Sequence, residues 1–154
     1  MITSLHNPKV KLLRSLRLHK YREQEHCFLV EGIRIVGEAL ACAAPVETVV
    51  YAPDLLVSER AQALVEQVDP DRLLALSAEA FRSLSDRDDP QGIAAVVRIE
   101  DRPLSALSLS AEMLVVVAYQ LSDPGNLGAI IRTAERAGPD RDRQIGRASC
   151  RERV

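Results

Sequence analysis

The sequence predicts an α/β fold, in which a small N-terminal α/β sandwich is followed by the first strand, loop and helix of a second α/β domain. Over residues 1–99, short β-branched runs alternate with amphipathic helical stretches, which is typical of an α/β sandwich with a largely parallel or mixed sheet. Residues 100–111 contain one proline and three serines with little helical periodicity, as expected of a linker. The chain has 154 residues, 47% of them hydrophobic, which is enough for a packed core.

The first helix and strand are predicted from capping and periodicity. Asn7-Pro8 is typical of a helix start, and apolar residues follow at helical spacing, so we expect a basic amphipathic helix over residues 8–19. Residues 27–30 form a short β-prone run, which Glu31-Gly32 interrupts before a helical stripe resumes at Ile33. This order indicates a strand that leads into a helix.

The same alternation continues along the chain. Strands are expected at residues 46–51, 72–76 and 93–99, and helices at 58–68, opened by a serine cap, and at 77–83. Residues 113–119 are nearly all apolar or β-branched, as expected of a strand buried on both faces of a parallel sheet. A loop over residues 120–126 and a helix that stops at Gly138-Pro139 follow. Such a strand–loop–helix unit is a frequent place for ligands in open α/β sheets.

The net charge of −2 conceals a strong asymmetry along the chain. Residues 1–34 carry seven Lys or Arg against three Glu, a local charge of +4, whereas residues 35–112 carry six Arg against fourteen acids, a local charge of −8. A basic region on an acidic body is typical of proteins that contact a phosphate-rich partner such as RNA, although a solvated basic helix has the same composition. The candidate RNA-binding residues of this region are Lys9, Lys11, Arg14, Arg17, Lys20 and Arg22.

Composition also argues against several other classes of protein. No stretch approaches the roughly 18 to 20 apolar residues that span a bilayer, and the N-terminal region lacks an apolar signal-peptide core, so we expect a cytoplasmic protein. Cys27, Cys42 and Cys150 have neither the even number nor the spacing of a disulfide framework or a zinc site, and the histidines suggest no metal site. Dinucleotide and P-loop motifs are absent from the sequence.

The helix that follows the predicted loop has two distinct faces. At 100° per residue, one side is apolar, and the other carries small residues in its first turn followed by Arg132 and Arg136. The N-terminus of such a helix offers unpaired N–H groups to an anion such as phosphate. The alternative is that Asp123 or Asn126 caps the helix and that Arg132 is a solvated surface residue.

Residues 123–138, with the sequence Asp-Pro-Gly-Asn-Leu-Gly-Ala-Ile-Ile-Arg-Thr-Ala-Glu-Arg-Ala-Gly, resemble the first motif of the SpoU (TrmH) RNA 2'-O-methyltransferases, a branch of the SPOUT superfamily. Three upstream segments resemble the N-terminal substrate-binding domain of that family. They are Asn7-Pro8 with Lys11, Phe28-Leu-Val-Glu-Gly32 and Pro90-Gln-Gly-Ile93. The resemblance covers residues 1 to about 139.

The resemblance implies an RNA substrate-binding domain at residues 1–99, a linker at 100–111 and the start of a SPOUT (α/β knot) methyltransferase domain at 112–143. It also implies methyl transfer from S-adenosylmethionine to a ribose 2'-hydroxyl of rRNA or tRNA, usually by a homodimer. Asn126 and Arg132 match catalytic positions of the motif, and Glu135 is a further catalytic candidate. Arg136, on the same helix, is a candidate RNA contact.

The resemblance assigns Arg132 to deprotonation of the hydroxyl, but its chemistry suggests a second role. A guanidinium stays protonated in proteins and is a poor general base. It can instead bind the adjacent phosphate through two parallel hydrogen bonds and hold the hydroxyl in line with the methyl group. We therefore expect positioning to be at least part of the work of Arg132.

The pattern of the family stops after Gly138. The later motifs, which by the resemblance would form the knot and bind S-adenosylmethionine, are absent, so no cofactor-binding residue is assigned and we expect a truncated, inactive methyltransferase. Residues 144–154 are expected to be a non-native tail, because residues 145–154 can be written in codons that match a common sequencing-library adapter. A non-catalytic RNA-binding module is the alternative function, and a nucleotide-binding α/β protein is a third hypothesis.

Overall fold

The computed structural model describes residues 1–100, 116–119, 121 and 123–137. The chain divides into two compact units, Met1–Glu100 and Asp101–Val154, and each unit is described separately. The linker expected after residue 100 and the tail expected at residues 144–154 lie outside the described residues. The predicted domain boundaries therefore stay predictions.

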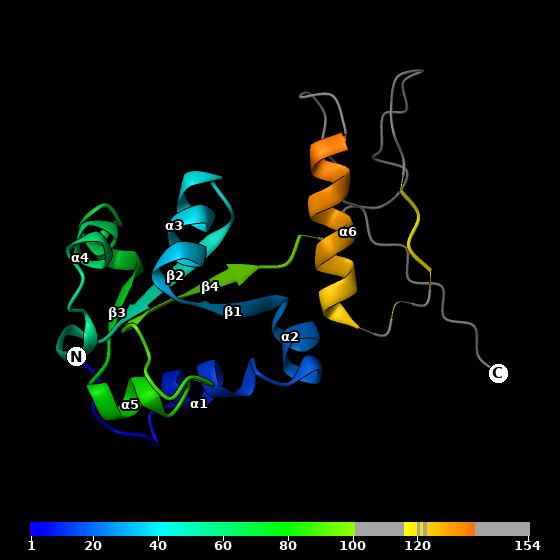
Figure 1. Cartoon of the computed structure of the whole chain (residues 1–154). Coiled ribbons are helices and arrows are strands. Elements are labelled where there is room, and N and C mark those ends of the chain that lie inside the picture. The colour runs from blue at the N-terminus through cyan, green and yellow to red at the C-terminus, as the bar shows by residue number, and fades with distance from the viewer. Residues whose placement is uncertain (101–115, 120, 122, 138–154) are drawn as a thin grey trace. The chain divides into compact units, whose positions relative to one another are not determined.

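The first unit is built around a four-stranded mixed sheet with the strand order β1-β4-β2-β3 (Figure 1). Its strands are β1 (Cys27–Glu31), β2 (Val46–Tyr51), β3 (Leu73–Ala75) and β4 (Ile93–Arg98). β4 is antiparallel to both β1 and β2, whereas β3 is parallel to β2. The predicted α/β class is confirmed, and of the two sheet types expected the sheet is the mixed one.

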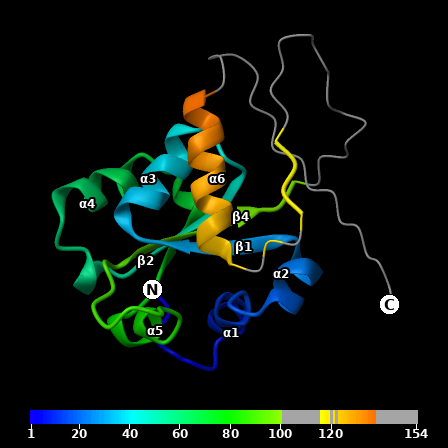
Figure 2. The same cartoon turned by 45° about the vertical axis from the view of Figure 1, so that its right-hand side comes forward.

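Helices cover both faces of this sheet, as Figures 1 and 2 show. α1 and α5 pack on one face through a core that includes Leu13 and Phe81, and α3 and α4 pack on the other through a core that includes Val36 and Ala61. The helices of this unit are α1 (Pro8–Ser15), α2 (His19–Glu25), α3 (Ile33–Ala41), α4 (Glu59–Glu66) and α5 (Ala78–Arg82), with short 3-10 turns at Pro53–Leu55 and Pro70–Arg72.

The central strand β4 joins the two cores. Ala94 and Val96 belong to the core under α1 and α5, while Ile93, Ala95 and Val97 belong to the core under α3 and α4. Successive side chains of a strand point to opposite faces, so a strand covered on both sides needs apolar residues throughout. This explains why β4 reads as a continuous apolar run.

The helix predicted over residues 8–19 is wrong in one respect, because the chain breaks after Ser15 and restarts at His19. Leu18 has extended backbone angles, with φ −92° and ψ 132°. The Arg22 guanidinium donates to the carbonyl oxygens of Leu16 and Arg17 at 3.1 and 2.7 Å. These contacts satisfy carbonyls that a helix end leaves unpaired, so the break is stabilised by a side chain of the following helix.

A serine cap was predicted for the helix at residues 58–68, but a serine side chain caps the next helix instead. The Ser77 hydroxyl accepts a hydrogen bond from the Ala80 N–H at 3.2 Å at the start of α5. Ser58 occupies the cap position of α4, but its side chain forms no cap hydrogen bond. Helix and strand ends otherwise differ from the predicted ones by a residue or two, because terminal turns are weakly held.

In the second unit the structure describes one helix, α6 (Pro124–Ala137). The strand predicted at residues 113–119 is wrong for its described part, since residues 116–119 have no strand structure and Val117 is 84% exposed. A strand forms by pairing with another strand, and the described residues of this unit include none to pair with. Among the described residues, no helix combines the length and apolar character needed to cross a membrane.

Candidate functional site

The motif helix α6 begins with a side-chain cap. The Oδ1 of Asp123 accepts a hydrogen bond from the Gly125 N–H at 2.7 Å, and Pro124 occupies the first helical position, where its missing N–H costs nothing. Asp123 is therefore the capping residue of the two candidates. Asn126 lies inside the first turn with an exposed side chain, rather than in the predicted loop.

Further along α6, Arg132 folds back over Gly128. A β-carbon built on Gly128 would lie 3.2 Å from the Nη1 atom of Arg132, so the guanidinium passes closely over the bare glycine. Arg132 and Arg136 are both exposed, and Glu135 lies on the same helix. The structure thus places Asn126, Arg132 and Arg136 on one helix, with both guanidinium groups open to solvent.

In the first unit, the lysines predicted to bind RNA point to solvent. Lys9, Lys11 and Lys20 are exposed. Lys9 and Lys11 of α1 form no hydrogen bond or ion pair through their side chains within residues 1–100. The Nζ of Lys20 lies 6.0 Å from the centre of the Tyr21 ring.

The three arginines of the first unit that were predicted to bind RNA each contact another part of that unit. The Nη2 of Arg14 donates to the Ser83 hydroxyl at 2.9 Å and so links α1 to the end of α5. Arg17 forms an ion pair with Asp86, and Arg22 donates to the carbonyls at the end of α1. The lysines and the arginines of this basic region therefore differ: the arginines also hold elements of the fold together.

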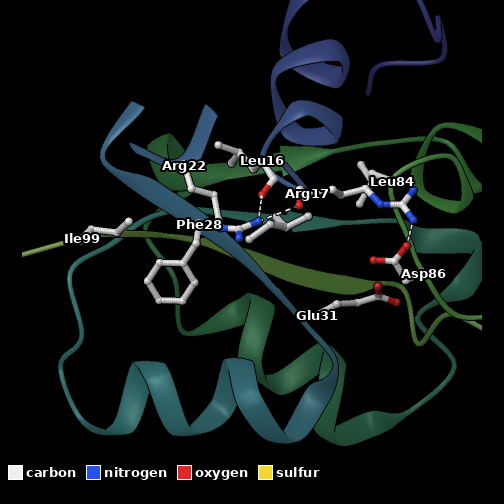
Figure 3. Close-up of a pocket in the computed structure, with 9 residues that line it drawn as sticks. Leu16, Arg17, Arg22, Phe28, Glu31, Leu84, Asp86 and Ile99 are labelled. Atoms are coloured by element: carbon white, nitrogen blue, oxygen red, sulfur yellow. Dashed lines mark hydrogen bonds and ion pairs between the residues drawn. The ribbon is translucent and has the colours of Figure 1, made fainter. Parts of the chain in front are cut away.

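A groove of about 530 Å³ lies beside β1 (Figure 3). Both oxygens of the Glu31 carboxylate, at one end of the groove, lie within 2.7–2.8 Å of the Ser85 hydroxyl, which donates to them. Arg17 and Arg22 were predicted to bind RNA, but no sequence pattern predicts the groove itself, because its residues come from segments far apart in the chain. The groove is lined by Leu16, Arg17, Arg22, Phe28, Leu29, Glu31, Leu84, Asp86 and Ile99.

The upstream motif segments have packing roles at the start of α3. The Gln91 Oε1 accepts a hydrogen bond from the Ile33 N–H at 3.0 Å. Gly32, with φ +111°, lies against the same side chain, and Gly92 has φ +71° with no room for a β-carbon beside Leu55. The fold thus brings the Phe28–Gly32 and Pro90–Ile93 segments together, and Gln91 caps α3.

The described residues provide no group of three or more His, Cys, Asp or Glu side chains placed to hold a metal ion. Cys27 and Cys42 are free thiols, and Cys27 is buried. Burial raises the pKa of the Cys27 thiol above its usual value, the carboxylates of Glu47 and Glu25 raise it further, and Arg98 opposes them. Cys27 is therefore a packing residue rather than an activated nucleophile.

Comparisons with known proteins agree on one family. The family described as MRM3-like substrate binding domain matches residues 7–95. Among curated proteins, the 23S rRNA (guanosine(2553)-2'-O)-methyltransferase RlmP of Bacillus subtilis is 34% identical over 139 residues, which cover 90% of this chain and 52% of the relative. The chain spans about half the length of this relative.

The similar solved structures are also RNA methyltransferases. A crystal structure of an RNA 2'-O ribose methyltransferase matches with a TM-score of 0.69 and 35% identity, covering 89% of this chain and 52% of that chain. The SpoU methyltransferase AviRb from Streptomyces viridochromogenes, in complex with the cofactor AdoMet, matches with a TM-score of 0.75 and 26% identity, covering 86% of this chain and 51% of that chain.

Proposed function

The chain belongs to the family of MRM3-like substrate-binding domains, within the SpoU (TrmH) RNA methyltransferases, and from this premise we propose that it contacts RNA as part of an rRNA or tRNA 2'-O-ribose methyltransferase. The first unit holds the RNA, and α6 contributes residues to methyl transfer. The observation that carries the proposal is the coincidence of the family match, residues 7–95, with the unit that displays the exposed lysines.

Backbone contact with RNA is the role of the exposed lysines. Lys9 and Lys11 lie two positions apart on α1, and their ammonium groups are free to pair with phosphates. Such contacts fix the position of an RNA without selecting its sequence. Arg14, Arg17 and Arg22 keep the same proposed role, which they share with their contacts inside the fold.

In the proposed reaction, α6 presents Arg132 to the ribose and its neighbouring phosphate. A protonated guanidinium holds a phosphate with two parallel hydrogen bonds, which orients the ribose 2'-hydroxyl for attack on a methyl group. Asn126, one and a half turns earlier, has a free side-chain amide to bind the sugar or a phosphate. Glu135 and Arg136 are the further candidates for catalysis and RNA contact.

S-adenosylmethionine would supply the methyl group, as the AdoMet-bound structural neighbours suggest. A ligand site normally surrounds about 70–90% of a small molecule. The described residues of the second unit form one helix and short segments without helix or strand structure, which do not enclose such a ligand. These residues by themselves therefore do not fit the cofactor. A homodimer and a cytoplasmic location are further parts of the proposal.

RNA binding by the full 154-residue chain tests the proposal directly. Fluorescence anisotropy with a labelled single-stranded rRNA fragment, measured over a range of salt concentrations, gives the slope of log K against log salt. Replacing Lys9 and Lys11 together by alanine should lower the magnitude of this slope by about 1.5, because each phosphate contact contributes roughly 0.7–0.9.

The matched control is the double variant Arg34→Ala/Arg60→Ala. Both arginines are exposed, on α3 and α4, which cover the sheet face away from α1. This control should keep the wild-type slope. Equal slopes for the lysine variant and the wild type would contradict the assignment of α1, and absence of RNA binding would contradict the proposed function.

A further inference from the structure

The outer side of β1 has no neighbouring strand within the described residues (Figure 1). The Gly32 N–H donates to the Ile93 carbonyl at 2.9 Å, so Gly32 faces β4. Backbone groups of an antiparallel ladder alternate in direction, and the N–H and C=O groups of Leu29 and Glu31 therefore point to the open edge. Such groups are free to hydrogen-bond a ligand that lies along the strand.

The groove beside this edge combines apolar walls with opposite charges (Figure 3). Arg22 and Phe28 lie at one end, and Glu31 and Asp86 at the other. Leu16, Leu29 and Leu84, which come from three different segments, also line the groove. The pocket of about 530 Å³ has both apolar and charged lining residues, and its volume is in the range of small-molecule sites.

The charged end of the groove keeps spare hydrogen-bonding capacity. Glu31 accepts the single proton of the Ser85 hydroxyl, whereas a carboxylate has about four acceptor positions. Arg17 pairs with Asp86, and a guanidinium has five N–H donors, of which such a pair uses at most two. The two side chains are 41% and 70% exposed, respectively, so a ligand can reach them.

We propose that this groove binds an unstacked guanine base of the RNA. The adjacent N1–H and N2–H groups of guanine donate to the Glu31 carboxylate, and Arg17 donates to O6. The flat base lies against the leucines, and the open backbone of β1 supplies further partners. Unpaired RNA bases are commonly held in this way, by contact with the ring face and hydrogen bonds to the Watson–Crick edge.

The Glu31 carboxylate favours guanine over the other three bases. Adenine and cytosine present a lone pair of a ring nitrogen where guanine presents N1–H, and this lone pair would face the negative charge of Glu31. Uracil has a single N–H on that edge. The inference rests on the proposed function, since an RNA ligand is assumed, but it adds a base preference that backbone contacts from lysines do not produce.

Short RNA oligomers test the groove with the full chain. We expect a uridine hexanucleotide containing one guanosine to bind about tenfold more tightly than the all-uridine hexanucleotide, as a two-hydrogen-bond contact predicts. Replacing guanosine by inosine, which lacks the N2 amino group, should remove much of this preference. Fluorescence anisotropy at one salt concentration measures all three affinities.

The variant Glu31→Gln sharpens the test. Its amide oxygen still accepts from Ser85, but its NH₂ group meets the N–H donors of guanine, so the guanosine preference should disappear while affinity for the uridine oligomer stays unchanged. Glu66→Gln, the same change at an exposed position at the end of α4, is the control and should keep the preference. Thermal unfolding checks that both variants are folded.

Three outcomes would overturn the inference. Equal binding of the guanosine and uridine oligomers by the wild type contradicts the groove site but leaves the proposed function intact. No binding of any RNA contradicts both. Concentration-dependent dimerisation that protects the Leu29 and Glu31 amides from hydrogen exchange without RNA would show that the open edge pairs with a second strand instead.

Discussion

The helices α1 and α6 are both basic and amphipathic, but only α1 has a buried apolar face. In α1, Val10 and Leu13 are 0% and 4% exposed, whereas in α6 Leu127 and Ile131 remain 43% and 38% exposed. A helix in water is stabilised mainly by packing of its apolar face rather than by propensity. α1 is therefore fixed by the sheet beneath it, whereas within the described residues α6 has its own cap and backbone hydrogen bonds.

The arginines on the polar faces of the two helices also differ in their contacts. Arg14 of α1 donates to Ser83 and helps to hold α1 against α5. Arg132 of α6 lies over Gly128 and forms no hydrogen bond or ion pair with the described part of the chain. The arginine of α1 therefore has a structural explanation, whereas the role of Arg132 in RNA positioning stays a proposal.

The largest expected difference in stability comes from replacing one apolar leucine by alanine in each helix. Leu13→Ala leaves a cavity in the core under α1 and should lower the free energy of unfolding of the first unit by about 3 kcal/mol. Leu127→Ala removes a side chain that is already 43% exposed and should change stability by about 0.5 kcal/mol or less. Urea unfolding followed by circular dichroism measures both, and similar losses would mean that α6 has a packed partner.

Glycine replacement should have opposite signs in the two regions. In Gly92→Ala the new β-carbon would lie 2.7 Å from the Cβ of Leu55 and 2.8 Å from its backbone carbon, at φ +71°. The combined clash and strain should destabilise the first unit by about 2–3 kcal/mol. Gly128→Ala meets only the flexible end of Arg132 and should stabilise α6 locally by up to about 1 kcal/mol.

Unfolding in urea measures the loss of stability in Gly92→Ala. For Gly128→Ala, ¹³C chemical shifts along α6 measure the helix population. Gly37→Ala is the control within the first unit, because its β-carbon would lie 3.6 Å from Leu64, an ordinary contact. A loss at Gly37 as large as at Gly92 would contradict the steric explanation. A lower helix population in Gly128→Ala would show that the Arg132 contact stabilises α6.

Much of the first unit could be predicted because its signals are local. Residues 93–97 are all apolar because this part of β4 is buried on both faces. Asn7-Pro8 marks a helix start because the Asn7 side chain accepts from the Lys9 N–H at 2.9 Å. The break after Ser15 could not be predicted, since it depends on Arg22 reaching back to two carbonyls. The spacing of apolar residues does not reveal a cap that a side chain of the following helix supplies.

The candidate site could be predicted only in part. The motif of α6 is contiguous, so Asn126 and Arg132 could be found from the sequence, and they stay proposals. The groove beside β1 could not be found, because Arg17, Glu31 and Asp86 become neighbours only when α1, β1 and the loop after α5 pack together. The strand predicted at 113–119 is wrong for residues 116–119, because apolar composition predicts burial, whereas a strand also needs a partner.

The smallest expected effect tests the caps of the two helices. Asn7→Ala removes the acceptor for the Lys9 N–H and should cost the first unit about 1 kcal/mol, visible in its urea midpoint. Asp123→Ala removes the acceptor for the Gly125 N–H, which lies 2.7 Å away, and should lower the helix population of α6 without moving that midpoint. Because α1 is held by packing, its cap changes stability but not helicity, whereas α6 should fray from its first turn. A midpoint shift of equal size in both variants would show that the two units unfold together, and α6 would then share in the stability of the first unit.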